Sequence, residues 1–288
     1  MGFLLAVITG VSYGLSLVAA RASYDYGVNF MTIIACRYVL LCTVLSGFLF
    51  VTHQPLKLTL NEGTKSFFIG LIALSTSISY LASAVFIPVS LTTIIFYTHP
   101  LVTVWIATKF SGERSTGFEV AATAVACLGL VLVLNVTFLA LDHWGVLLGL
   151  YASVSAAAVF IMSNGVLTRV DPIRFTLHMA FGGALVACVT LFMIGGIEMP
   201  ISRIGWVWFA MAITLNVVGL ILMFASVSMI GPVSTPMILN IEPVTAIIFA
   251  VLLLNESMTV IQVVGASIVL VAVLLAQISR VKRAGARV

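Results

Sequence analysis

The chain has 288 residues, of which 62% are hydrophobic and only 8% are charged, and its formal net charge is +4. Such a chain has too few polar side chains to cover a water-soluble globule, so its composition indicates a protein that lies in a lipid bilayer. Its basic residues are spread over short loops, and we expect no nucleic-acid partner.

Ten apolar stretches, each close to the roughly 20 residues that a spanning helix needs, follow one another along the chain. They run approximately over residues 2–20, 30–51, 66–87, 90–109, 118–138, 145–167, 174–195, 206–229, 234–254 and 260–279. The loops between them are short and leave no room for a soluble domain. We therefore predict an all-α membrane protein with ten transmembrane helices.

The lysines and arginines indicate which side of the membrane each loop faces. The two termini share one side of the membrane when the spans number ten. If that side is the cytoplasm, ten basic residues lie inside and only Arg21 and Arg203 lie outside. The ten are Lys57, Lys65, Lys109, Arg114, Arg169, Arg174, Arg280, Lys282, Arg283 and Arg287. We expect both termini in the cytoplasm, with residues 280–288 as a basic tail that anchors this topology and can touch anionic lipid head groups.

The sequence repeats itself at one constant offset, and we call residues related by this offset repeat equivalents. Leu4, Leu5, Ser12, Ala82, Ser83, Pro100, Glu113 and Val120 match Leu147, Leu148, Ser155, Ala225, Ser226, Pro243, Glu256 and Val263. We expect a first repeat over residues 1–143 and a second over residues 144–279, with five helices each. Because five is an odd number, the second repeat enters the membrane from the opposite side, and the pair is inverted.

Two segments, residues 82–114 and 225–257, carry the most specific pattern. In each, a span ends and a Pro-Val-Ser turn reverses the chain, at Pro88 in the first segment and at Pro232 in the second. The next span has a proline near its middle, and a short loop with a glutamate closes the unit. These prolines are Pro100 and Pro243, and the glutamates are Glu113 and Glu256.

These landmarks resemble the EamA-type transporters of the drug/metabolite transporter (DMT) superfamily, and the resemblance covers the entire chain. It implies an inverted pair of five-helix repeats in the cell (inner) membrane. It also implies transport of small organic solutes, including amino acids, amines, metabolites, nucleotide sugars and drugs, often outward. It does not select among these substrates.

The mid-span prolines free backbone carbonyls in the membrane. A proline inside a helix removes one donor, so Pro100 frees the carbonyl of Phe96 and Pro243 that of Leu239. Such groups need partners in lipid. They find them in neighbouring helices, or they line a hydrated cavity at the transporter's midplane.

His99 and Glu242 directly precede these prolines and are repeat equivalents near the bilayer centre. Residues near a pseudo-two-fold axis approach each other, so the two can share a cavity and bind a proton or a charged group of the substrate. An ionised carboxylate at this depth costs several kcal/mol unless it is paired, hydrated or protonated. The alternatives are a protonated Glu242 hydrogen-bonded to a neighbouring helix and a neutral packing role for His99.

Four further residues are weaker candidates for the site. Tyr97 and Asn240 are also repeat equivalents, but two residues on a helix point about 200° apart, so they face elsewhere unless the proline unwinds the turn. Tyr13 and Tyr80 can offer aromatic faces to an apolar or cationic solute.

Arg37 is the only basic residue well inside a predicted span. Three readings stay open: it pairs with a carboxylate of the substrate, it snorkels toward the head groups, or it neutralises Glu242 in the resting state.

Two other features are read as structural. Glu113 and Glu256 each complement the dipole of a helix N-terminus. Gly10 with Gly14, and Gly145 with Gly149, form GxxxG pairs that predict close helix packing.

The chain shows no catalytic motif, zinc helix or phosphate-binding loop, so we expect no enzyme, metal or cofactor and no ATP-driven pump. We predict a secondary transporter, an exporter, that works by alternating access and is driven by a gradient of protons or of the solute itself. The alternatives are an uncoupled facilitator or exchanger, and a membrane scaffold subunit or intramembrane enzyme that transports nothing.

Overall fold

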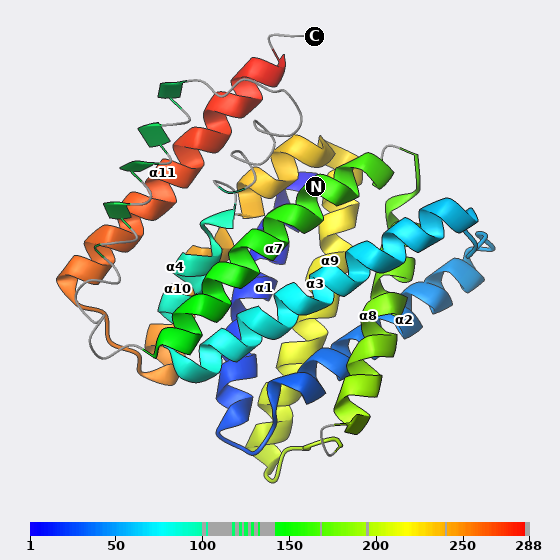
Figure 1. The fold of residues 1–288 in the computed structure, drawn as a ribbon, viewed down its shortest axis with the longest axis horizontal. Helices are drawn as coiled ribbons and strands as arrows, with labels where there is room; N and C mark the ends of the chain where they lie inside the picture. Colours follow the sequence, from blue (N-terminus) through cyan, green and yellow to red (C-terminus); the bar gives the residue numbers. More distant parts are fainter. Residues whose placement is uncertain are drawn as a thin grey trace.

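A computed structural model describes residues 1–99, 142–167, 169–193, 196–239 and 241–285, with isolated positions between residues 102 and 132. In these ranges the chain forms helices, turns and loops, and no β-strand (Figure 1). The helices are α1 (Gly2–Tyr24), α2 (Phe30–Val51), α3 (Leu60–Phe86), α4 (Val89–Phe96), α7 (His143–Leu167), α8 (Pro172–Met193), α9 (Arg203–Leu239), α10 (Ile241–Leu254) and α11 (Val260–Gly285).

The helices have the length and the surface of membrane spans. Six stretches are long and apolar enough to cross a bilayer, namely α1, α2, α3, α7, α8 and residues Arg203–Met223 of α9. Large apolar side chains face outward on several of them, such as Phe50 of α2 and Phe192 of α8, which are 76% and 83% exposed. In water such surfaces would associate, whereas lipid covers them. The count of ten spans stays a prediction, because most of residues 100–141 lie outside the described part of the chain.

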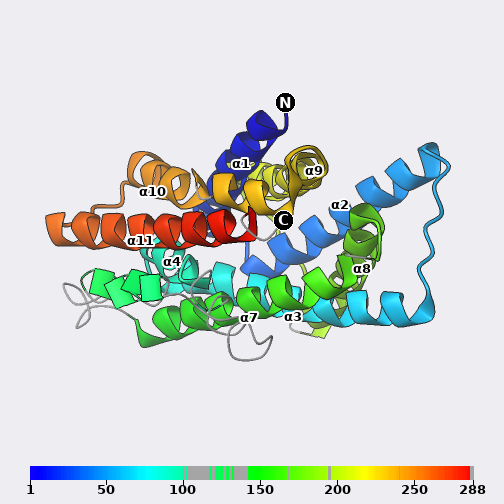
Figure 2. The ribbon, with the colours of Figure 1, turned by 90° about the horizontal axis from the view of Figure 1, so that it is seen from above.

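Helices of the first half pack mainly on helices of the second half. α1 packs against α9, and α7 packs against α3. Figure 2 shows α3 and α7 along one side of the molecule and α1 and α9 along the opposite side. By the offset of the sequence repeat, α7 corresponds to α1, and the first part of α9 corresponds to α3. The two pairings therefore correspond to each other, as expected for two repeats that face each other. α2 also packs against α8, α1 against α10, α4 against α7, and α4 against α10.

The glycine pairs lie where helices cross closely, as predicted. A β-carbon added to Gly14 of α1 would lie 2.9 Å from the backbone nitrogen of Ala246 in α10. One added to Gly149 of α7 would lie 3.0 Å from Ile95 in α4. These two crossings could not form with larger side chains at the same backbone distance.

The predicted turn at Pro88 is confirmed, but the one at Pro232 is wrong. α3 ends at Phe86 and α4 begins at Val89, so the chain reverses at Pro88. In the second half α9 continues through Pro232 to Leu239, and the span boundary predicted there falls inside one helix. A proline can kink a helix without ending it, and the C-terminal, golden part of α9 runs across the direction of its N-terminal part (Figure 1).

Helix α3 begins at Leu60, before the predicted start of that span at residue 66. Thr59 caps it, because its hydroxyl accepts the backbone N–H of Glu62 over 3.4 Å and donates to the Glu62 carboxylate over 2.8 Å. The pattern Thr-x-x-Glu is a capping box, and it was the signal in the sequence for this earlier start.

Candidate functional site

The end of α4 is the first component of the site. The helix stops at Phe96, and Tyr97 and Thr98 form a turn. Thr98 Oγ1 donates to the carbonyl of Ile95 over 2.7 Å, and His99 Nδ1 donates to the carbonyl of Phe96 over 3.1 Å. The carbonyl that Pro100 was predicted to free is therefore satisfied by the neighbouring imidazole. Pro100 itself lies outside the described residues.

The start of α10 is the second component. Helix α9 ends at Leu239, α10 begins at Ile241, and Glu242 lies in the first turn of α10, followed by the buried Pro243. The backbone of α1 approaches here, because a β-carbon on Gly10 would lie 3.4 Å from the carbonyl oxygen of Leu239. The second freed carbonyl thus faces α1. Asn240, a predicted site residue, falls outside the described residues.

The hydroxyl of Tyr97 lies near the carboxyl group of Glu242 and interacts with it, and this contact joins the two components. Tyr97 reaches the carboxyl group because the chain unwinds in the turn after α4. The sequence predicted that Tyr97 would face the site only if the helix unwound here. His99 lies beside Tyr97, with ring centroids 5.4 Å apart. The repeat equivalents His99 and Glu242 are therefore linked through Tyr97.

Four aromatic residues form a cluster beside this contact, namely Tyr80, Phe96, Tyr97 and His99. The rings of Tyr80 and Phe96 are stacked at 4.3 Å, and those of Phe96 and His99 are 4.9 Å apart. The hydroxyl of Tyr80 is buried and lies near that of Thr93 without the geometry of a hydrogen bond. Phe96 was not among the predicted site residues. The signal for it was the run Phe-Tyr-x-His, which directly precedes a mid-span proline.

The members of the site differ in exposure. Tyr97 is 5% exposed, whereas Glu242, His99, Phe96 and Tyr80 are half-buried.

Arg37 and Tyr13 extend the site toward α2. Tyr13 interacts electrostatically with both Glu242 and Arg37 and packs against Gly219 of α9. Arg37 lies with its guanidinium carbon 5.6 Å from the centre of the Tyr38 ring, and it forms no ion pair with Glu242. Neutralisation of Glu242 by Arg37 is thus not observed in this conformation, and the other two readings of Arg37 stay predictions.

Glu256 holds the opposite end of α4 in place. Its carboxylate accepts the backbone N–H of Val89 over 2.6 Å, and the N–H and hydroxyl of Ser90 over 3.1 and 2.7 Å. Asn255 adopts a left-handed φ of 53°, which asparagine tolerates, at the end of α10. The structural reading of Glu256 is confirmed, and the helix that it caps belongs to the other half of the chain. Glu113 lies outside the described residues.

In the described part of the chain, no three His, Cys, Asp or Glu residues gather as a metal site would require. The arrangement instead offers one carboxyl group, one imidazole and several aromatic faces, where the turn after α4 meets the start of α10 from the other half of the chain.

Comparisons with known proteins agree with the arrangement of the helices. A family model described as the EamA-like transporter family matches residues 1–135 and again residues 143–277. Twenty-eight chains of solved structures match, among them one titled "Crystal structure of protein" with a TM-score of 0.64 and 13% identity, over 93% of this chain and 97% of that chain. This likeness shows the fold alone. No curated protein matches the sequence.

Proposed function

We propose that the chain, which belongs to the EamA-like transporter family and is thus an integral, multi-pass membrane transporter, is a secondary transporter that exports small organic solutes. Amino acids, amines and drug-like molecules are the solute classes in question. The two halves form ten spans in inverted orientation, in the cell (inner) membrane, with both termini in the cytoplasm. The cross-half pairing of the helices and the ten-to-two charge bias support this topology.

The observation that carries the proposal is the junction of α4 and α10. Helix α4 ends in the turn of Tyr97 and Thr98, and this turn lies near Glu242 in the first turn of α10, so that the side chains of Tyr97 and Glu242 interact. A helix interrupted near the middle of a span marks the substrate site of many transporters.

The groups at this junction suit a cationic ligand. Glu242 accepts a proton or the charged group of the substrate, and Tyr97 orients its carboxyl group. The cluster of Tyr80, Phe96 and His99 offers aromatic faces, which attract organic cations. Tyr13 and Arg37 lie at the rim toward α2, where Arg37 can receive a carboxylate of the substrate.

Alternating access follows from the position of the site between the halves. When the halves rock against each other, the contacts of α4 with α7 and of α10 with α1, which join the halves, change. A proton on Glu242 and the substrate would then compete for the same carboxyl group, which couples their movement in opposite directions.

The test uses the purified protein in liposomes. Proton uptake or release is recorded while pooled metabolites and amphipathic amines are added outside, for the wild type, Glu242→Gln and the control Glu198→Gln. Glu198 is an exposed acid in a loop outside the site. We expect a proton flux that Glu242→Gln lacks and Glu198→Gln keeps. Wild-type transport by Glu242→Gln across pH would refute the role of this residue.

The contact between Tyr97 and Glu242 also favours a second candidate, an uncoupled facilitator or exchanger in which Glu242 is only a polar contact. Collapse of the proton gradient distinguishes the two, because an exchanger with an imposed solute gradient continues to work. If no solute moves in either assay, transport by this chain rests on its family alone, and a membrane scaffold subunit that transports nothing is the alternative.

A further inference from the structure

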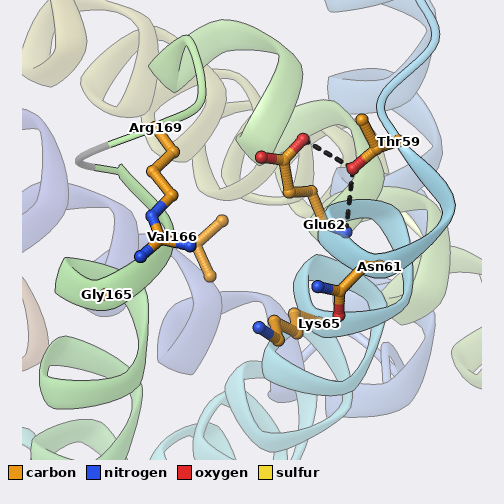
Figure 3. A pocket seen from close by; sticks show the side chains of 7 residues that line it. All are labelled: Thr59, Asn61, Glu62, Lys65, Gly165, Val166 and Arg169. Carbon is orange, nitrogen blue, oxygen red and sulfur yellow. Dashed lines mark hydrogen bonds between the residues drawn. The ribbon is translucent and has the colours of Figure 1, made fainter.

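A small polar pocket lies outside the proposed transport site, where the start of α3 meets the end of α7 (Figure 3). Its volume is about 60 Å³. It is lined by Thr59, Asn61, Glu62, Lys65, Val166 and Arg169, with Gly165. Because α3 and α7 belong to different halves of the chain, the pocket bridges the two repeats.

The lining of the pocket carries more positive than negative charge. Lys65 on α3 and Arg169 after α7 extend from its two walls, and neither forms an ion pair with a described residue (Figure 3). The one carboxylate of the lining, Glu62, accepts a hydrogen bond from the hydroxyl of Thr59 over 2.8 Å. The lining therefore carries one net positive charge.

The opposite end of the molecule shows that the pocket is not a necessary product of the fold. Ser202 is the repeat equivalent of Thr59 and caps α9 as Thr59 caps α3, with the Gly205 N–H donated to the Ser202 hydroxyl over 3.1 Å. Tyr26 is the repeat equivalent of Arg169, and Trp208 is that of Lys65.

The equivalent space at that end is filled. A β-carbon on Gly205 would lie 2.6 Å from Cβ of Tyr26 and 3.0 Å from Cβ of Pro200. Both ends of the molecule thus have a hydroxyl that caps a helix, but the side chains beside the caps differ. Tyr26 and Pro200 fill the space at one end, whereas Lys65 and Arg169 line a pocket at the other.

We propose that this pocket binds the phosphate group of an anionic phospholipid. It opens where two apolar helices end, which is the depth of lipid head groups, and cationic pockets between transmembrane helices bind such groups. Arginine and lysine are the usual partners of phosphate oxygens. A zwitterionic choline lipid carries its own cation beside the phosphate, so the pocket prefers a head group with net negative charge.

A third cation follows Arg169 closely in the sequence but is not part of the lining. Arg174 in the first turns of α8 has a buried Nε atom without a hydrogen-bond partner. A bound phosphate would link α3 and α7, so it would stabilise the contact between the two halves at this end.

The experiment measures thermal unfolding of the full-length protein in a neutral detergent. Phosphatidylglycerol, phosphatidylcholine or inorganic phosphate is titrated against the wild type, Lys65→Gln, Arg169→Gln and the double variant. We expect a rise of the midpoint with phosphatidylglycerol, and a roughly five-fold higher half-maximal lipid concentration for each cation removed, since a basic residue near an anionic surface contributes about 1 kcal/mol.

The matched control is Lys57→Gln, which removes an exposed charge of the same sign just before Thr59 without touching the pocket. It is expected to keep the wild-type response. If Lys57→Gln loses as much as Arg169→Gln, or if both lipids act equally, binding is diffuse and the proposal is overturned. If inorganic phosphate alone reproduces the shift with the same dependence on the variants, the ligand is a soluble phosphate and the lipid assignment fails.

A charge-preserving variant guards against a folding defect. Lys65→Arg combined with Arg169→Lys keeps both cations and should respond to phosphatidylglycerol nearly as the wild type does. Loss of the response in this variant as well would show that the charges are not what the lipid recognises.

Discussion

Ser83 and Ser226 are repeat equivalents, and they make the same hydrogen bond to the opposite half of the molecule. The hydroxyl of Ser83 donates to the carbonyl of Gly145 over 2.7 Å, and that of Ser226 donates to the carbonyl of Gly2 over 2.9 Å. Gly2 and Gly145 are repeat equivalents as well, and both serines are 0% exposed. The contacts that join the halves therefore follow the same offset as the sequence.

Removing either hydroxyl should weaken the protein to a similar degree. We expect Ser83→Ala and Ser226→Ala each to lower the free energy of unfolding by about 1 kcal/mol, the net worth of a buried hydrogen bond. Denaturation in mild detergent measures this, with Ser267→Ala as the control, because the Ser267 hydroxyl donates to the carbonyl of Val263 within its own helix on an exposed face. A large loss for one serine and none for the other would contradict their equivalence.

The cap that Glu256 places on α4 predicts a graded loss of stability. Glu256→Ala removes the acceptor of three hydrogen bonds and should cost about 2 kcal/mol, while Glu256→Gln keeps one acceptor oxygen and should cost less. Hydrogen exchange of the amides of Val89 and Ser90 reads the cap directly. Unchanged protection of these amides in Glu256→Ala would show that the first turn of α4 holds without it.

Local signals in the sequence predicted the parts of the fold that local physics decides. Pro88 has no backbone N–H to continue a helix, and the turn there was correctly predicted. Gly10 and Gly14 lack side chains, and they lie at a close crossing as the spacing indicated. The need of the Phe96 carbonyl for a partner was also correct, and His99 meets it.

Contacts between the halves could not be predicted in this way. Pro232 follows the same Pro-Val-Ser pattern as Pro88, yet α9 continues through it, because surrounding helices decide whether a proline kinks or ends a helix. That Glu256 would cap α4, a helix of the other half of the chain, was equally invisible. The contact of Tyr97 with Glu242 could be predicted only by knowing that the helix unwinds at residues 97 and 98.

The crossing of α1 and α10 predicts a strong effect from one methyl group. A β-carbon at Gly14 would lie 2.9 Å from the carbonyl oxygen of Glu242 and from the backbone nitrogen of Ala246, so Gly14→Ala must push the helices apart. We expect it to cost about 1–3 kcal/mol, as overpacking does, and to reduce transport, because it displaces the turn that carries Glu242.

Gly47→Ala in α2 is the matched control. Nothing lies within 4 Å of a β-carbon at Gly47, so this substitution should be neutral or stabilise the helix by up to about 1 kcal/mol. Thermal unfolding and solute uptake in liposomes give both readouts. Equal effects of the two substitutions would show that α1 does not need to approach α10 closely.

The last prediction separates two tyrosines of the aromatic cluster. The hydroxyl of Tyr97 interacts with the carboxyl group of Glu242, whereas the hydroxyl of Tyr80 makes no hydrogen bond and its ring is stacked on Phe96 at 4.3 Å. Tyr97→Phe removes this polar neighbour of the carboxyl group and should lower kcat/KM for transport about 2- to 10-fold, since a polar interaction of this kind is worth about 0.5–1.5 kcal/mol.

Tyr80→Phe keeps the stacked ring and removes only a buried hydroxyl without a partner. Its transport should be close to that of the wild type, and its stability equal or slightly higher, because an unsatisfied buried polar group is lost. Initial rates of solute uptake over a range of concentrations, with unfolding midpoints for both variants, test the pair. If Tyr80→Phe impaired transport more than Tyr97→Phe, the hydroxyl of Tyr80 would be the one that contacts the substrate, and the role of Tyr97 in orienting Glu242 would be wrong.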